Sequence, residues 1–155
     1  YSAKISAARQ EALHGKLWEQ GEDGVKRYLQ INKLEPMQRA LDELGASAWM
    51  AGLRSEQTAH RAGLRRIDRQ DGRIKLHPIL HWSSEHVDDY MMKHDLPYHP
   101  MVEQGYRSIG DHHSTIPTTA EMDPRDGRIL GQTRECGLHL PLTKEQDQSL
   151  KSSGL

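Results

Sequence analysis

The sequence predicts an α/β fold in which a parallel sheet is flanked by helices. Apolar residues recur at helical spacing in the first part of the chain, and a short continuous apolar run follows at residues 48–53. Such a run after a helix is typical of a strand that is buried on both faces of a parallel sheet. Further on, Asp71-Gly72 is a strong hairpin turn signal between two short segments.

Three helices are expected before the apolar run. The first spans Ser2 to His14 and stops at Gly15, and the second runs from about Gly24 to Ile31. The third spans Glu35 to Leu44, with Pro36 in its first turn, where a missing amide proton is tolerated. The apolar residues that are expected to form the buried stripe of this third helix are Met37, Ala40, Leu41 and Leu44.

Downstream of the strand, local signals predict a hairpin and one more helix. Arg66 to Gln70 is expected to pair with Arg73 to His77 around the Asp-Gly turn. A helix is expected from about Ser84 to Lys93, with Ser83 as its cap. Its capping box is only partial, because His86 stands where a carboxylate or an amide is usual.

Composition predicts one lean domain followed by a tail. The chain has 155 residues, of which 35% are hydrophobic and none is Phe, so a single small core is expected. Residues 1–140 are assigned to the domain, and the polar residues 141–155 to a flexible tail. Residues 96–134 show no sustained periodicity, and long irregular stretches commonly carry binding loops.

Charge and cysteine content exclude several classes of protein. A net charge of −1 and a pI near 6.9 give no global attraction to nucleic acid or to an anionic membrane. No apolar run has the length of a membrane span and no leader is recognised, so a cytoplasmic protein is expected. A single cysteine excludes an internal disulfide and fits a reducing compartment. Tyr1 stands in place of an initiator methionine, so the start is expected to be processed, trimmed or cut.

Positive charge gathers directly after the predicted strand. The cationic or potentially cationic residues of this segment are Arg54, His60, Arg61, Arg65 and Arg66. Gly52 at the strand end would let a ligand approach the backbone, and Arg54 with Arg61 offers fork-shaped donors for phosphate or sulfate. Arg54 is followed by Gln57 in the same loop. A solvated basic loop is the alternative, and the pattern alone leaves both interpretations open.

The irregular region holds two further candidate ligand-binding segments. Aromatic, imidazole and hydroxyl groups gather in residues 98–115, where they could wrap a polar ligand. A zinc site is disfavoured because paired ligands at tight spacing are missing, and solvated histidines are the plainer interpretation. Arg125-Asp126-Gly127-Arg128 reads as a turn whose two arginines face either one anion or solvent.

Cys136 is the only cysteine of the chain, and its neighbours leave its role open. Arg134 and His139 would favour the thiolate if they lie near the sulfur. Glu135 acts in the opposite direction, because a neighbouring carboxylate raises the pKa of a thiol. A catalytic thiol and a buried structural thiol both remain compatible with this pattern.

Taken in order, the motifs of this chain resemble the C-terminal half of the phosphoadenylyl-sulfate reductases. The resemblance covers about residues 6–140, and any one of its motifs would be weak alone. The segments that carry it are Lys16 to Gly21, Asn32 to Met37, Ala51 to Gln57, Tyr98 to Pro100, Gly105 to Asp111 and Glu135 to His139. The resemblance implies an adenine-nucleotide-hydrolase-like α/β fold with a parallel sheet.

The resemblance also implies an activity and a site. A cysteine attacks the sulfur of 3′-phosphoadenylyl sulfate, and thioredoxin or glutaredoxin then releases sulfite from the S-sulfonate. The residues that match family positions at the substrate or in catalysis are Cys136 as nucleophile, His139, Tyr106, Arg54, Gln57, Arg125 and Arg128. Arg61 is added as a substrate-binding residue on the chemistry of the basic segment. A homodimer is implied, since members of the family are often dimeric.

Departures from the family pattern refine these expectations. Adenylyl-sulfate reductases that resemble this family hold a four-iron cluster on paired cysteines, whereas this chain has Tyr28-Leu29 and Asp111 with Ser114 at those places. No iron–sulfur cluster or other metal cofactor is therefore expected, and the 3′-phosphorylated substrate is favoured. Ile116 stands where some members have an arginine or another polar residue.

The largest departure is that the N-terminal strands and phosphate-binding loop of the family do not occur in this sequence. The chain alone is therefore expected to be marginally stable, with little or no activity. The alternatives to a phosphoadenylyl-sulfate reductase are a remnant that binds nucleotide without catalysis and an adenylyl-sulfate reductase, which the cysteine count disfavours.

Overall fold

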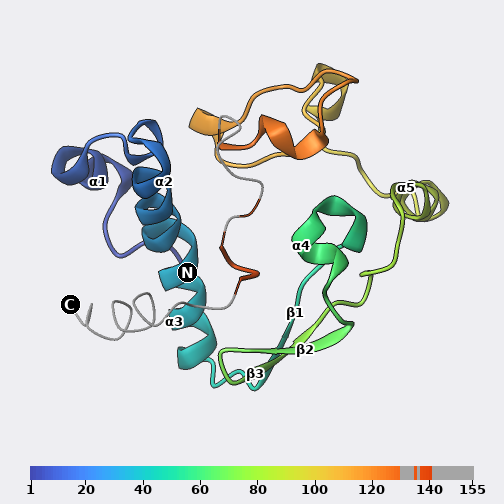
Figure 1. Ribbon diagram of the computed structural model, residues 1–155, viewed down its shortest axis with the longest axis horizontal. Helices are drawn as coiled ribbons and strands as arrows, with labels where there is room; N and C mark the ends of the chain where they lie inside the picture. The colour runs from blue at the N-terminus through green and yellow to red at the C-terminus, as the bar shows by residue number, and fades with distance from the viewer. Residues whose placement is uncertain (130–134, 136, 141–155) are drawn as a thin grey trace. The chain divides into compact units, whose positions relative to one another are not determined.

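The structure is a computed structural model that describes residues 1–129, 135 and 137–140 (Figure 1). The chain forms two units, one made of Tyr1–Ala46 with Glu135–Leu155 and the other of Ser47–Arg134. The predicted tail, residues 141–155, lies outside the described residues. The predicted domain boundary at residue 140 therefore stays a prediction.

In the first unit, helix α1 (Ala7–His14) begins later than predicted because Ser6 caps it. The Ser6 hydroxyl accepts a hydrogen bond from the third amide of the helix at 3.3 Å, which satisfies a donor that the helix itself leaves unpaired. Gly15 follows with a φ of 69° and ends the helix as predicted. Gln10 and Asn32 exchange two side-chain hydrogen bonds of 3.0 and 2.9 Å, which join α1 to the helical turn Gln30–Leu34.

Helix α2 (Gly21–Leu29) continues into α3 (Glu35–Glu43) through one π turn, Gln30–Leu34. The gap predicted between the second and third helices is therefore wrong, and Figure 1 shows the ribbon running on. Pro36 has no amide proton and would clash with the carbonyl four residues earlier in a regular helix. The π turn, closed by the Glu35 amide on the Gln30 carbonyl, accommodates this change without ending the helix.

In the first unit, the buried apolar residues are not those of the stripe that was predicted for the third helix. The buried apolar side chains are Leu17, Val25, Leu29 and Leu34. Leu44, the last residue of the predicted stripe, is 72% exposed, and Met37, Ala40 and Leu41 are only half-buried. Periodicity identifies the apolar face of a helix, whereas burial also requires a second element that packs on that face.

The second unit contains a three-stranded sheet with the strand order β1-β3-β2. Strand β1 (Ala48–Met50) pairs with β3 (Arg73–Leu76) in parallel, and β2 (Ile67–Gln70) pairs with β3 antiparallel. The parallel pairing of the apolar run is therefore confirmed within a mixed sheet. The predicted hairpin is also confirmed, since Asp71 and Gly72 both have positive φ, as a tight hairpin turn of this kind requires.

The apolar run is less buried than predicted. Ala51 and Leu53, which follow β1, are 8% and 4% exposed, whereas Met50 within the strand is 71% exposed. Met50, Leu76 and Ile67 lie opposite one another in the register and form one row across the sheet. The prediction of burial on both faces is wrong in the described part of the chain, because Met50 and Ile67, the two ends of this row, are exposed.

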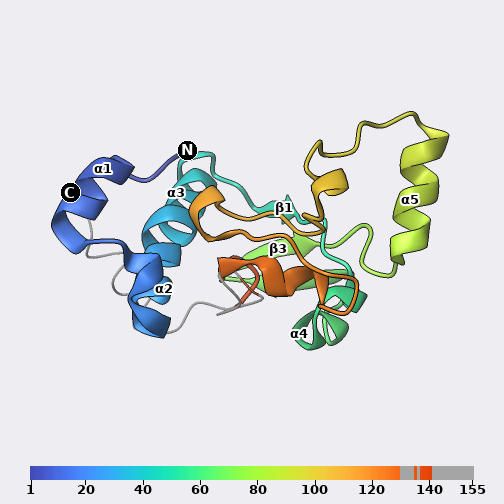
Figure 2. The ribbon, with the colours of Figure 1, turned by 90° about the horizontal axis from the view of Figure 1, so that it is seen from above.

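The described part of the second unit contains two α-helices, one after strand β1 and one after strand β3. Helix α4 (Ala59–Ala62) lies beyond the carboxyl end of β1 (Figure 2), and α5 (Ser84–Lys93) has the predicted bounds. The capping box of α5 is complete. The Ser83 hydroxyl accepts a hydrogen bond from the His86 amide, and His86 Nδ1 accepts one from the Ser83 amide at 3.4 Å. A histidine ring nitrogen thus replaces the expected carboxylate.

The remainder of the second unit is irregular, as predicted. It contains three short 3₁₀ turns, Val102–Gln104, His112–Ser114 and Pro124–Gly127, and a bridge between Thr115 and Arg128 joins the ends of the second and third turns. Among the residues that the structure describes, no helix combines the length and the apolar character that crossing a membrane requires.

Candidate anion-binding cleft

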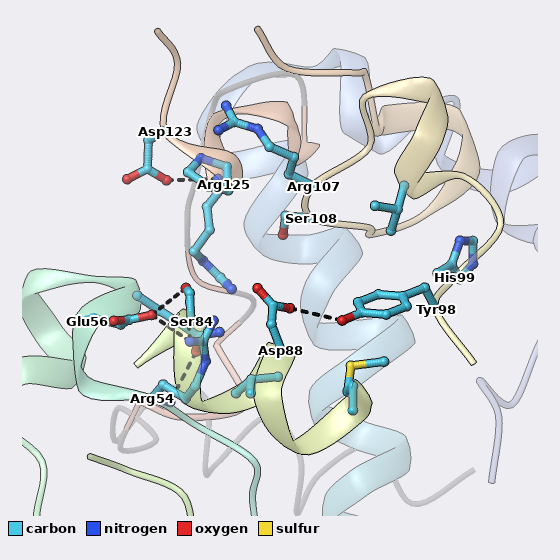
Figure 3. Close-up of a pocket in the computed structure, with 15 residues that line it drawn as sticks. Arg54, Glu56, Ser84, Asp88, Tyr98, His99, Arg107, Ser108, Asp123 and Arg125 are labelled. Atoms are coloured by element: carbon cyan, nitrogen blue, oxygen red, sulfur yellow. Dashed lines mark hydrogen bonds and ion pairs between the residues drawn. The ribbon is translucent and has the colours of Figure 1, made fainter. Parts of the chain in front are cut away.

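A cleft of about 760 Å³ opens in the second unit, between the turn after β1, the start of α5 and the irregular loops (Figure 3). The turn contributes Arg54, Glu56 and Gln57, and α5 contributes Ser84 and Asp88. The loops contribute three more polar side chains that matter below, Tyr98, Arg107 and Arg125. The cleft therefore combines cationic, anionic and hydroxyl groups from segments far apart in the sequence.

Arg54 is placed at the cleft by a hydrogen-bonded turn. Its backbone amide donates to Gln57 Oε1 at 3.2 Å, and the same oxygen accepts a hydrogen bond from the Arg61 guanidinium. Arg61 is 4% exposed and lies in α4. Thr58 caps this helix, because its hydroxyl accepts a hydrogen bond from the Arg61 amide at 3.3 Å. Gln57 thus lines the cleft, while Arg61 supports it from the interior.

Arg54, Glu56 and Ser84 form a closed group at one side of the cleft. Arg54 Nη1 donates to Glu56 Oε1 at 2.5 Å and to Ser84 Oγ at 3.1 Å. The Ser84 hydroxyl in turn donates to the same Glu56 oxygen at 2.7 Å. This group ties the turn after β1 to the first residue of α5, and Figure 3 shows the three side chains together.

Arg125 enters the cleft from the loop turn Pro124–Gly127. It is 8% exposed, and its backbone amide donates to Asp123 Oδ1 at 2.8 Å. Figure 3 shows its side chain extending from this turn towards Ser84. The turn can pack closely because residue 127 is glycine: a Cβ there would lie 2.4 Å from the Ile116 carbonyl oxygen.

Arg107 also lines the cleft, but its guanidinium is engaged by the surrounding loop. It donates to Thr118 Oγ1 at 3.0 Å, to the Met122 carbonyl at 2.6 Å and to the Thr119 carbonyl. Arg107 therefore fixes the shape of the loop at the cleft wall. It was not among the predicted site residues, although it lies in the glycine-containing segment that was expected to wrap a polar ligand.

Tyr98 and Asp88 face each other across another part of the cleft. The Tyr98 hydroxyl donates to Asp88 Oδ1 at 3.5 Å. Partial desolvation of the ring and the neighbouring Asp88 carboxylate raise the pKa of Tyr98. The ordinary pKa of 10.0 already leaves the phenol protonated at neutral pH, so it acts as a hydrogen-bond donor to Asp88.

The formal charges around the cleft cancel when histidine is neutral. The cationic side chains are Arg54, Arg107 and Arg125, and the anionic ones are Glu56, Asp88 and Asp123. Asp88 is engaged by Tyr98, and Asp123 by the Arg125 amide. The carboxylate that directly offsets Arg54 is that of Glu56, so the local positive patch expected from the sequence is partly neutralised.

The structure brings three of the predicted site residues together, namely Arg54, Gln57 and Arg125. Arg128 takes part in the bridge to Thr115, with its side chain packed beside Gly110. Tyr106 is half-buried, and its amide donates to the Met101 carbonyl at 3.2 Å. Their catalytic or binding roles, and that of Arg61, stay predictions.

The last two predicted residues belong to the C-terminal segment. His139 is half-buried in the first unit, and Cys136 lies outside the described residues. Gly137, next to that cysteine, has a φ of 82° and packs on Leu34, since a Cβ at Gly137 would lie 3.5 Å from the Leu34 methyl carbons. The π turn between α2 and α3 thus supports the residue that follows the thiol.

Comparison with known proteins places these features in a family. Residues 1–117 match the phosphoadenosine phosphosulfate reductase domain. The chain belongs to this family. The resemblance predicted from the motifs is thereby confirmed.

Relatives of known sequence support the same conclusion. A phosphoadenosine 5′-phosphosulfate reductase of Synechocystis is 54% identical over 100% of this chain and 63% of its own length. One from Photobacterium profundum is 48% identical over 100% of this chain and 59% of its own length. The chain spans less than two thirds of the length of these curated relatives.

A solved structure supports the fold class. The crystal structure of phosphoadenylyl-sulfate reductase from Candida auris, a phosphate complex, matches with a TM-score of 0.59 and 36% sequence identity. The match covers 72% of this chain and 53% of that chain. The α/β class predicted from the sequence is confirmed, with a mixed rather than a wholly parallel sheet in the described residues.

The described residues contain no group of three or more His, Cys, Asp or Glu side chains that could hold a metal ion. The rings of His112 and His113 meet edge to face, with their centroids 5.3 Å apart. The expectation of no metal cofactor stays a prediction.

Proposed function

We propose that this chain takes part in the reduction of 3′-phosphoadenylyl sulfate to sulfite and adenosine 3′,5′-bisphosphate. The observation that carries the proposal is the match of its whole length, at about half identity, to proteins named phosphoadenosine 5′-phosphosulfate reductase. The arginines of the cleft support it, because phosphate and sulfate are anions that guanidinium groups bind well. Reducing sulfate for assimilation is the corresponding cellular role.

In the first step, the Cys136 thiolate attacks the sulfate sulfur. An S–S bond forms, and the bond between that sulfur and the bridging oxygen of the nucleotide phosphate breaks. The nucleotide leaves with the electron pair, so negative charge develops on its phosphate. Cations close to this phosphate lower the barrier, and Arg54 and Arg125 are the side chains proposed to supply them. His139 is proposed to favour the thiolate, with Tyr106 as a further catalytic group.

In the second step, a dithiol reductant releases the product. A thiolate of thioredoxin or glutaredoxin attacks Cys136 Sγ of the S-sulfonate, sulfite leaves with the bonding electrons, and a mixed disulfide forms. The second thiol of the reductant then displaces Cys136, so the reductant supplies both electrons. Cys136 is the only cysteine of this chain, which is why an external dithiol is required. We place the reaction in the cytoplasm, where such dithiols are kept reduced.

The proposal includes no iron–sulfur cluster. Four thiolates normally hold a four-iron cluster, and this sequence contains one cysteine. Tyr28, Leu29, Asp111 and Ser114 stand at the places where the resemblance would put cluster ligands. This favours the 3′-phosphorylated substrate over adenylyl sulfate.

Intact-mass measurement after incubation with 3′-phosphoadenylyl sulfate tests the proposal. The measurement detects a single event per chain, so even with the low activity expected of the chain alone we expect an SO₃ adduct on Cys136 that is lost on addition of reduced thioredoxin and is absent in Cys136→Ser. A chain that binds the nucleotide without forming the adduct would instead be a non-catalytic nucleotide-binding remnant, and the proposal would be rejected. An equal adduct with adenylyl sulfate would overturn the substrate assignment.

A further inference from the structure

We infer that Glu56 is an internal competitor that limits the affinity of the cleft for anions, because its carboxylate occupies the place of a ligand anion beside Arg54. A ligand has to displace this carboxylate before it can use the guanidinium. The inference deepens the proposed function and rests on it for the nature of the ligand, a phosphate and sulfate ester.

The hydrogen bonds around Glu56 are those that an oxyanion would make. One oxygen, Oε1, accepts from Arg54 Nη1 at 2.5 Å and from the Ser84 hydroxyl at 2.7 Å. Both donors line the cleft. Moving the carboxylate away leaves a guanidinium and a hydroxyl that already point at one position, so the binding site needs no further rearrangement.

Burial decides which partner of the ion pair moves. The Arg54 side chain is 17% exposed and that of Glu56 is 41% exposed. Arg54 is also held through its backbone by Gln57, which the buried Arg61 supports. The glutamate can therefore swing into solvent at little cost, while the arginine stays in place.

The geometry of the contact makes Glu56 a weak competitor. It engages Arg54 through Nη1, whereas a phosphate or sulfate group can accept two parallel hydrogen bonds from a guanidinium. A partly exposed ion pair is worth a factor of only about 1.4 to 5 in an equilibrium. Every anion has to displace the same carboxylate, so the competition lowers the affinity for each anionic ligand by a similar factor.

Charge balance points in the same direction. The formal charges that line the cleft cancel, and the other two carboxylates, Asp88 and Asp123, accept hydrogen bonds from Tyr98 and from the Arg125 amide. Neutralising Glu56 would leave one net positive charge in the cleft. Removing its charge should therefore strengthen anion binding in general.

Titration with inorganic phosphate by calorimetry at fixed low ionic strength tests the inference. We expect Glu56→Gln to bind phosphate about 1.4- to 5-fold more tightly than the wild type. Glu85→Gln is the matched control, because it removes the same charge from an exposed residue of α5 and should leave phosphate affinity unchanged. The added substitution Arg54→Ala should abolish the gain of Glu56→Gln.

Acetate provides the second measurement. The affinity for acetate should also rise in Glu56→Gln and stay unchanged in Glu85→Gln, because both anions compete with the same carboxylate. Weaker, equal or undetectable phosphate binding by Glu56→Gln would overturn the inference, as would an equal gain in Glu85→Gln. These outcomes do not involve Cys136, so failure to form the S-sulfonate with intact phosphate binding would count against the proposed function alone.

Discussion

Arg54 and Arg61 carry the same charged group but occupy opposite sides of one turn. Arg54 keeps part of its side chain exposed and lines the cleft, whereas Arg61 is 4% exposed and donates to Gln57. A buried charged group is held by its partners, and a ligand reaches only what remains accessible. At the scale of the residue, accessibility rather than charge separates a candidate ligand-binding arginine from a supporting one.

Replacing Arg61 tests this division of roles. Arg61→Ala leaves Gln57 without one buried donor, so we expect the free energy of unfolding to fall by about 1–3 kcal/mol. Arg66→Ala, an exposed arginine nearby, should change it by less than about 0.5 kcal/mol. Urea denaturation measures both values. Equal effects of the two substitutions would contradict the supporting role of Arg61.

A second prediction concerns Gly127 in the turn that carries Arg125. A methyl group there would lie 2.4 Å from the Ile116 carbonyl oxygen and 2.9 Å from Thr118 Cγ2. Gly127→Ala should therefore destabilise the turn by about 1–3 kcal/mol and speed hydrogen exchange of the Ile116 amide, which donates to the Gly127 carbonyl at 2.8 Å. Gly63→Ala is the control, because its nearest contact would be an ordinary 3.7 Å. Unchanged exchange at Ile116 would show that the turn yields without strain.

At the scale of the element, the β2–β3 hairpin is specified by neighbouring residues. Its turn takes Asp71 and Gly72 into the left-handed region, where Gly and Asp are tolerated best. At the start of the hairpin, Asp68 Oδ1 accepts a hydrogen bond from the Arg69 amide at 2.9 Å and another from Arg65 Nη2 at 3.2 Å. These bonds stabilise the carboxylate and lower the pKa of Asp68.

The lowered pKa of Asp68 gives the hairpin a defined dependence on pH. Because the folded pKa lies below the ordinary value of 3.8, Asp68 contributes stability above that value and loses it as the pH falls through the folded pKa. Asp68→Asn should therefore be less stable than the wild type at neutral pH, with a difference that narrows towards about pH 2. Urea midpoints across this range measure the difference.

Asp89→Asn, on the exposed surface of α5, is the comparison for Asp68→Asn. It should not reproduce the narrowing of the difference towards low pH. A constant difference between Asp68→Asn and the wild type at all pH values would show that the carboxylate of Asp68 is not stabilised by its hydrogen bonds.

At the scale of the whole molecule, apolar surface is left open in both units. In the second unit, the row Met50–Leu76–Ile67 crosses one face of the sheet, and its outer members are 71% and 66% exposed. In the first unit, Leu44 of the α3 stripe is 72% exposed. Contiguous exposed apolar surface of this kind favours association.

This surface predicts a measurable behaviour of the chain. Ile67→Thr removes apolar area while keeping a β-branched side chain in the strand, so it should reduce light scattering and dye binding without lowering stability by more than about 0.5 kcal/mol. Ile67→Val keeps the apolar character and should behave like the wild type. Scattering that is identical in all three proteins would show that the sheet face does not drive association.

Local sequence signals predicted much of the backbone correctly. The bounds of α5, the hairpin and the stop at Gly15 follow from caps and turns that involve residues a few positions apart. The gap between the second and third helices was predicted wrongly, because a π turn can accommodate a proline within one continuous helix. A histidine also completed a capping box in which a carboxylate was expected.

The sequence by itself determined the family, the α/β class and the turn and loop segments of the cleft, since motifs and periodicity are properties of neighbouring residues. Tertiary structure alone decided which arginines line the cleft, that Glu56 and Ser84 hold Arg54, and which apolar residues stay exposed. Ser84 and Glu56 are far apart in the chain. Contacts of that kind depend on how elements pack, and side-chain accessibility is set by the same packing.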